Sequence, residues 1–276
     1  MTTFAAWVGV DPRGPGSIYL ASDSRISWGT ALKWDRGRKV FASCNHPDIL
    51  GYVGDVLFPS LMLAQLTSAI DAGVMYGIST KPAERFKQIE SSVKASFTLY
   101  PDRERRTFTI IYATREGEFS NCQFHLYSLS WNPLLGWKGS EIPMPDKSST
   151  LCILGSGETA FSEWQTQWEA STESGTSRAV FSAFCDALLS GRDPRTGGAP
   201  QLVGVYRKGS GRAFGVIYDE NPFLFGMRLE RDAASAASEL QWRNRFFERC
   251  DAQGRLLQGA KKHHVPESLG RIGPEY

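Results

Sequence analysis

The sequence predicts one domain in which antiparallel β-sheets carry helices on their outer faces. Three observations predict this class. Short apolar, β-prone segments are separated by turns, pairs of helical segments stand between groups of strands, and no long linker divides the 276 residues.

The first elements form a hairpin at the very start of the chain. Residues 3–10 are apolar and β-prone, residues 11–16 are rich in turn formers, and residues 18–22 predict a second strand. A strand that starts this early is expected to fix the N-terminus in a sheet. Further strands are expected over 39–43 and 49–53.

The rest of the chain alternates between the two periodicities. The expected elements are helices over about 57–73 and 81–97, strands over 107–113, 123–129 and 151–154, helices over about 158–169 and 178–189, and a hairpin of strands over 202–206 and 213–217. The glycines at 209–211 predict the turn of that hairpin, because no Gly-Lys-Ser/Thr follows as in a phosphate-binding loop.

The composition changes towards the C-terminus. Residues 240–250 predict one amphipathic helix, and residues from 261 onward are polar. We therefore divide the sequence into a main domain of residues 1–232 and a C-terminal helix and polar tail of residues 233–276.

Composition argues against several classes of protein. Lys and Arg number 31 and Asp and Glu 29, a balance typical of neither a nucleic-acid-binding protein nor a membrane-surface protein. The N-terminus does not resemble a signal peptide, and no run of about 18 apolar residues predicts a membrane span. Five cysteines without C-x-x-C spacing fit a reducing cytoplasm rather than a disulfide framework or a zinc site.

No cofactor or metal is expected either. The sequence contains no nucleotide-binding motif, and the neighbouring His263 and His264 stand in the polar tail without further candidate ligands.

A candidate nucleophile stands at the N-terminus. Thr2 has a small side chain, so we expect Met1 to be removed, which leaves Thr2 with a hydroxyl and a free α-amine. Such an amine has a pKa of about 7.7–8.0 and can accept a proton near neutral pH. A hydroxyl is a weak nucleophile unless a base of this kind is near. Alone, a threonine after the initiator methionine is usually only an N-terminus.

Four further motifs follow in order. They are Asp23-Ser24-Arg25 at a strand end, Lys39 sixteen residues after Asp23, the strand-to-helix turn Gly51–Asp55, and Gly155-Ser156-Gly157 with the later run Asp193–Gly198. Glycine turns that open helices expose backbone N–H groups, which an oxyanion needs.

This ordered set, over roughly residues 2–220, resembles proteasome β subunits and their bacterial relatives, the HslV protease and the Anbu group. The resemblance implies an α+β fold of the N-terminal-nucleophile hydrolase type, a four-layer αββα sandwich of two antiparallel sheets flanked by helices. It also implies a threonine-type peptidase or amidohydrolase.

The resemblance assigns roles to individual residues. Thr2 is the expected nucleophile, its amine the base or part of the proton relay, Lys39 the cation beside it, and Asp23 the partner that orients Lys39. The Gly54 N–H is the expected oxyanion donor. The outer polar group that positions the Thr2 amine is expected to consist of Ser156, Asp193 and Thr196.

Three features depart from the family pattern. The turn between Thr2 and Asp23 is about five residues longer, which a surface hairpin tolerates. Thr196 stands where the family usually has Ser. Tyr52 is expected in the substrate pocket, where its ring would narrow the space and set a preference, beside the apolar residues Ile26, Phe41 and Val56.

The resemblance leaves three functions open. The first is a peptidase that cleaves peptides or unfolded proteins inside a homo-oligomeric ring, with a separate ATPase unfoldase. The second is an amidase that acts on a small or modified substrate. The third is a non-catalytic ring subunit, against which the set of Thr2, Asp23 and Lys39 argues.

Overall fold

The structure is a computed structural model that describes residues 2–29, 31–237 and 239–262. In this part of the chain, strands form two large sheets and one separate hairpin. The larger sheet runs in the order β10 (Ser149–Leu154), β1 (Phe4–Asp11), β2 (Gly14–Ser22), β11 (Gln201–Tyr206), β12 (Arg212–Tyr218), β13 (Asn221–Leu224) and β14 (Met227–Arg228), with β15 (Gln241–Asn244) and β16 (Arg249–Cys250) joined through β12.

The second sheet has five antiparallel strands. Its order is β5 (Val40–Ala42), β6 (Asp48–Gly54), β7 (Phe108–Glu116), β8 (Gln123–Asn132) and β9 (Gly136–Ile142). The separate hairpin consists of β3 (Ile26–Trp28) and β4 (Leu32–Trp34). The helices are α1 (Leu57–Asp71), α2 (Pro82–Leu99), α3 (Glu158–Glu169), α4 (Ser177–Leu189) and α5 (Arg231–Ala236).

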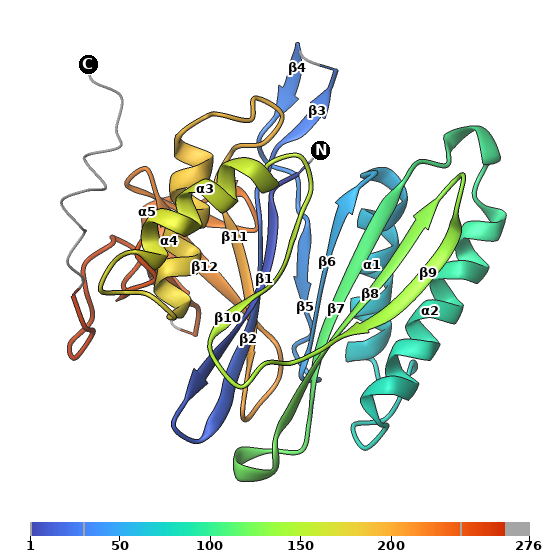
Figure 1. Ribbon diagram of the computed structural model, residues 1–276, viewed down its shortest axis with the longest axis horizontal. Helices are drawn as coiled ribbons and strands as arrows, with labels where there is room; N and C mark the ends of the chain where they lie inside the picture. The colour runs from blue at the N-terminus through green and yellow to red at the C-terminus, as the bar shows by residue number, and fades with distance from the viewer. Residues whose placement is uncertain (1, 30, 238, 263–276) are drawn as a thin grey trace.

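The alternation of side chains along β1 explains how the elements pack. Phe4 and Ala6 point into an apolar core shared with the five-stranded sheet, whereas Ala5 and Trp7 point into a second core beneath α3 and α4. A third core lies between the five-stranded sheet and helices α1 and α2. Helices therefore cover the outer face of each sheet, on opposite sides of the molecule (Figure 1).

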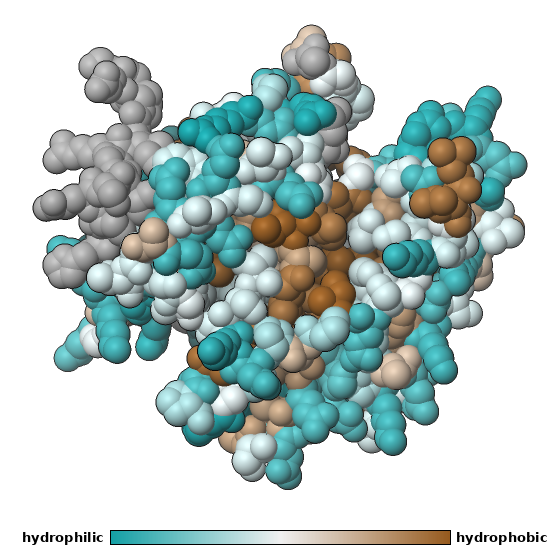
Figure 2. Space-filling view, in the orientation of Figure 1, coloured by the Kyte–Doolittle hydropathy of each residue, from teal (hydrophilic) through white to brown (hydrophobic). Residues whose placement is uncertain are grey.

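The surface reflects this packing. Figure 2 shows apolar side chains gathered in a hollow in the middle of one face, surrounded by mostly polar residues. Among the described residues, no helix combines the length and apolar character needed to cross a membrane.

The mixture of antiparallel sheets and helices predicted from the sequence is confirmed. The helix expected over 158–169 has those bounds in α3, and the glycines at 209–211 lie in the turn between β11 and β12. The sequence did not predict β3, β4, β9, β13 or β14.

The helix predicted over residues 240–250 is wrong. These residues contain β15 and β16, and β15 pairs in parallel with β12. The ring of Trp242 lies on Gly215, where a Cβ atom would come within 2.3 Å of it. Asn244 then closes a turn by accepting the N–H groups of Phe246 and Glu248 at 3.0 Å each. Sheet pairing buries Trp242 and Cys250, whereas Leu240, Phe246 and Phe247 are partly buried.

Candidate active site

The start of β1 lies beside the ends of two neighbouring strands. Since β1 pairs antiparallel with β2 and β10, Thr2 lies near Asp23 and near the turn after β10. The Asp23 N–H donates to the Thr3 carbonyl at 3.1 Å, and the Gly157 N–H donates to the Thr2 carbonyl at 3.3 Å. A Cβ atom on Gly155, whose φ is +97°, would lie 2.0 Å from the Thr2 carbonyl oxygen, so this approach requires glycine.

Lys39 reaches the same point from the other sheet. It precedes β5, and its Nζ donates to Asp23 Oδ1 at 2.7 Å and to Thr2 Oγ1 at 3.2 Å. Lys39 and Asp23 are fully buried, and Thr2 is 2% exposed. The structure thus places an ammonium, a carboxylate and a hydroxyl in one enclosed cluster.

The Asp23 carboxylate accepts hydrogen bonds on both oxygens. Besides Lys39, the Thr3 N–H reaches Oδ1 at 3.1 Å, and the N–H groups of Gly197 and Arg25 reach Oδ2 at 3.1 and 3.2 Å. Burial raises the pKa of Asp23 above its ordinary value, while the charge of Lys39 and these donors oppose the rise. Four donors around one carboxylate keep the charged form satisfied within the protein.

Burial lowers the pKa of Lys39 below the ordinary lysine value of 10.5. The negative charges of Asp23 and Asp35 oppose this effect, and the charge of Arg25 adds to it. An amine with a lowered pKa, within hydrogen-bond distance of a hydroxyl, can accept that hydroxyl's proton closer to neutral pH.

Arg25 fixes the loop that supplies one of the Asp23 donors. Its guanidinium forms a bidentate pair with Asp35 at 2.7 Å for each bond and donates to the carbonyls of Thr196 at 2.9 Å and Pro194 at 3.1 Å. A Cβ atom on Gly197 would lie 2.6 Å from this guanidinium. No role was predicted for Arg25 or Gly197, although both stand in the motifs Asp23-Ser24-Arg25 and Asp193–Gly198.

The expected outer polar group is only partly assembled. Asp193 binds the Arg195 N–H at 3.0 Å and its Nε at 3.1 Å, and the Thr196 hydroxyl donates to the Asp193 carbonyl at 3.3 Å. Within residues 2–29, 31–237 and 239–262, Ser156 Oγ and Asp193 Oδ2 are buried and no hydrogen bond of ordinary geometry reaches either atom. Among the described residues, no hydrogen bond joins Ser156, Asp193 or Thr196 to the Thr2 side chain. Although burial opposes it, the neighbouring Ser156 and Arg195 groups lower the pKa of Asp193.

Gly54 ends β6 with a φ of +102°. A Cβ atom there would lie 2.4 Å from the Thr107 carbonyl oxygen, so both the conformation and the close packing require glycine. Gly54 also lines a cavity with a volume of about 770 Å³.

The four expected pocket residues, Ile26, Phe41, Tyr52 and Val56, all line this cavity. The Tyr52 ring is buried, and its hydroxyl donates to the Arg38 carbonyl at 3.1 Å, so the ring is held as part of the wall. Thr2 is not among the lining residues.

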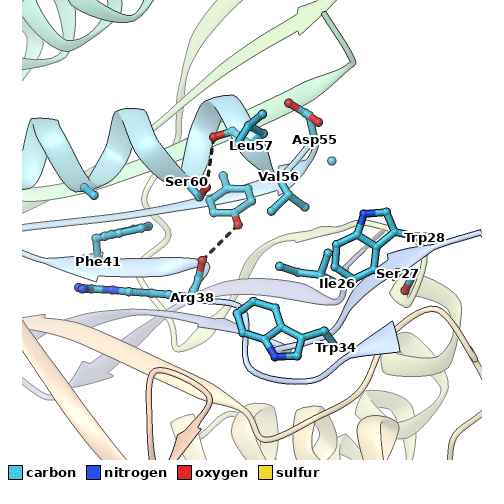
Figure 3. Close-up of a pocket in the computed structure, with 14 residues that line it drawn as sticks. Ile26, Ser27, Trp28, Trp34, Arg38, Phe41, Asp55, Val56, Leu57 and Ser60 are labelled. Carbon is cyan, nitrogen blue, oxygen red and sulfur yellow. Dashed lines mark hydrogen bonds between the residues drawn. The ribbon is translucent and has the colours of Figure 1, made fainter. Parts of the chain in front are cut away.

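Other parts of the cavity wall were not predicted from the sequence. Trp28 and Trp34 come from the β3–β4 hairpin, and Figure 3 shows them grouped with Ile26 at one end, with Phe41 and Arg38 at the other. The Arg38 guanidinium lies 4.4 Å from the centre of the Phe41 ring. Both tryptophans stand in a hairpin whose only sequence signal is a short β-prone segment.

Several other basic and aromatic residues lie away from the cluster. Lys33 is exposed. His125 Nδ1 lies 2.9 Å from Glu141 Oε1. Trp164 and Trp168 are buried in the core beneath α3 and α4. His263 and His264 lie outside the described residues.

Comparisons with known proteins yield a structural likeness alone. No protein-family model matches the sequence, and no curated protein matches it either. Among solved structures, eukaryotic HslV from Trypanosoma brucei is similar over 74% of this chain and 99% of its own, with a TM-score of 0.46 and 11% sequence identity. A likeness of this size transfers no function, so the function proposed below depends on the geometry of the site.

The buried pair makes a prediction about stability. Asp23→Ala leaves the Lys39 ammonium buried without its counter-charge, so the free energy of unfolding should fall by about 3–5 kcal/mol. The double variant Asp23→Ala with Lys39→Met removes both charges and should recover part of that loss. Urea unfolding of the two single variants and the double variant measures the coupling. Additive losses would contradict a direct interaction.

Proposed function

We propose that this chain is an N-terminal threonine hydrolase, a proteasome-like peptidase built on the four-layer αββα sandwich of the N-terminal-nucleophile hydrolases. The observation that carries the proposal is the cluster at the start of β1, in which Lys39 Nζ lies 3.2 Å from Thr2 Oγ1 and 2.7 Å from Asp23 Oδ1. The sequence resemblance to proteasome β subunits supports the same reading.

In the proposed reaction, removal of Met1 gives Thr2 a free α-amine. Thr2 Oγ attacks the carbonyl carbon of a peptide bond, and its proton passes to the amine or to Lys39. The C–N bond then breaks, and the leaving amine takes up that proton. Water hydrolyses the resulting ester at Thr2, which releases the acyl product and restores the hydroxyl.

Two further groups complete the proposed machinery. The Gly54 N–H stabilises the negative oxygen of the tetrahedral intermediate, a contribution typically worth about 2.7–4 kcal/mol per donor. The free Thr2 amine is positioned by an outer polar group that consists of Ser156, Asp193 and Thr196. Ser156 Oγ and Asp193 Oδ2 support this role because the two residues are neighbours, both atoms are buried, and neither forms a well-shaped hydrogen bond within the described residues.

The substrate is a peptide or an unfolded protein. The side chain before the cleaved bond enters the cavity walled by Ile26, Phe41, Tyr52 and Val56. These four apolar or aromatic side chains and the indole rings of Trp28 and Trp34 make much of the wall apolar, so apolar side chains fit the cavity best.

We also propose that copies of this chain assemble into a ring in the cytoplasm and that a separate ATPase delivers substrates. Exposed apolar side chains around the cavity support an assembly. Trp28, Trp34 and Leu57 line it and are 58%, 50% and 57% exposed, and Leu61 follows one helical turn after Leu57 with 57% exposed.

Covalent labelling tests the nucleophile. A threonine-directed epoxyketone or β-lactone should form one adduct, which mass spectrometry maps to Thr2 after confirming that Met1 is absent. Thr2→Ala should abolish the adduct and lower kcat about a thousandfold or more. Thr2→Ser should still form the adduct and still cleave the substrate. Thr166→Ala, on the exposed face of α3, is the matched control and should label fully. An adduct that persists in Thr2→Ala would refute the assignment.

The lowered pKa of Lys39 predicts how activity depends on pH. Because the neutral amine accepts the proton, kcat should rise with pH, with a midpoint below the ordinary lysine value of 10.5. Asp23→Asn removes the negative charge that favours the ammonium, so residual activity should rise at lower pH than in the wild type. Asp251→Asn, at a distant paired carboxylate, should leave the midpoint unchanged. A midpoint that moves to higher pH in Asp23→Asn would contradict this role.

Light scattering after size-exclusion chromatography tests the assembly. A ring should have a mass several times the 30.6 kDa of one chain. Replacing Leu57 and Leu61 by Ser should release smaller species if these side chains contribute to the contact. A wild-type monomer or dimer would favour the amidase over the chambered peptidase.

A further inference from the structure

Gln201 is a fully buried polar residue at the first position of β11. Its Oε1 accepts the backbone N–H of Lys39 at 3.0 Å. Its Nε2 lies 3.1 Å from the Asp23 carbonyl oxygen, 2.7 Å from the Gly37 carbonyl oxygen and 3.1 Å from Ser24 Oγ. One amide therefore bonds four residues from two segments of the chain, 23–24 and 37–39, around the candidate active site.

These contacts satisfy backbone groups that lie just beyond the ends of two strands. Asp23 follows the last residue of β2, and Lys39 precedes the first residue of β5. The Asp23 N–H is bound to Thr3, and the Lys39 carbonyl accepts the Tyr52 N–H at 3.2 Å. The complementary groups are the Asp23 carbonyl and the Lys39 N–H, and Gln201 binds both.

The bond to Lys39 also joins the two large sheets. Gln201 begins β11 and Asp23 directly follows β2 of the nine-stranded sheet, whereas Lys39 leads into the five-stranded one. An amide suits this position because it donates and accepts without adding charge. A carboxylate would place a second negative group near Asp23, and an apolar side chain would leave the Lys39 N–H and the Gly37 carbonyl unpaired.

We propose that Gln201 is a positioning residue of the active site, which holds the backbones of Asp23 and Lys39 in register so that the Lys39 amine lies on the Thr2 hydroxyl. This role rests on the proposed function of that cluster. Gln201 acts through the two backbones and touches neither the hydroxyl nor the substrate.

The test compares Gln201→Met and Gln201→Glu with Gln165→Met. Gln165 is the matched control because its Nε2 also bonds a side chain, Thr150 Oγ1 at 2.8 Å, but on α3. Gln201→Met should lower kcat for a fluorogenic peptide at least about tenfold with little change in KM, because transition-state geometry is lost rather than substrate binding. Gln165→Met should retain the wild-type kcat.

Gln201→Glu keeps the shape and the acceptor for the Lys39 N–H, so it serves if the Met variant does not fold. The added carboxylate should favour the ammonium of Lys39 and move the midpoint of the kcat–pH profile to higher pH by about one unit. A wild-type kcat in Gln201→Met would overturn the proposal, since a residue that only fills space can be replaced by an apolar side chain of similar size. A wild-type kcat–pH profile in Gln201→Glu would overturn it as well.

A second measurement separates this proposal from the proposed function. NMR of the protein with ¹⁵N-labelled lysine follows the Lys39 amine through a pH titration, and Lys39→Met identifies its signal. The titration midpoint should move to lower pH in Gln201→Met whether or not the wild type cleaves peptides, because an amine displaced from Asp23 loses the charge that favours the ammonium. If the midpoint moves but the wild type is inactive and is not labelled at Thr2, the proposed hydrolase function is refuted. The proposal that Gln201 positions Lys39 then still holds. An unmoved midpoint in an active enzyme would refute only the role of Gln201.

Discussion

The site depends on one interaction, the buried ion pair between Lys39 and Asp23. Burying two charges costs several kcal/mol for each, and their attraction offsets this only when the remaining donors and acceptors are satisfied. Here the Asp23 carboxylate has three backbone N–H donors besides the ammonium, and Lys39 has the Thr2 hydroxyl as a further partner. Because both charged groups have these additional hydrogen-bond partners, the Lys39 amine is held in one direction.

The surrounding backbone follows from that requirement. For Gly197 to donate to Asp23, its loop must pass beside the Arg25 guanidinium, which leaves no space for a side chain. For Thr2 to lie beside Lys39, its carbonyl must lie against Gly155, and the Thr3 side chain then takes the place that a Cβ atom on Gly157 would need. Glycine is therefore required at these turns because neighbouring groups occupy the space of a Cβ atom. The position of a glycine at the start of a helix does not by itself explain this requirement.

Much of this arrangement was accessible from the sequence, because its signals are local. The spacing between Asp23 and Lys39, the glycine turns and the helical periods each depend on a few adjacent residues, and they predicted most strands and four of the five helices in the described residues. The β-prone residues of the β3–β4 hairpin are too few to stand out. Residues 240–250 misled because their apolar positions fit a helix as well as an edge strand, and only the contact of Trp242 with Gly215 decides between them. Gln201 gave no signal, since its four partners come from distant segments.

The division of the cluster between two sheets explains why the core matters for chemistry. Thr2 and Asp23 lie on the nine-stranded sheet, whereas Lys39 and Gly54 lie on the five-stranded sheet. The distance between the hydroxyl and the amine therefore depends on how the sheets pack, and an error of about 1 Å in such a distance can cost a hundredfold in rate. The Phe4 ring, two residues after Thr2, lies so close to Gly51 of β6 that a Cβ atom there would come within 2.5 Å of it. This contact sets the spacing of the sheets directly beside the site, and the ion pair sets their register at the same point. Apolar packing and the charged cluster are thus two parts of one constraint on the position of Thr2.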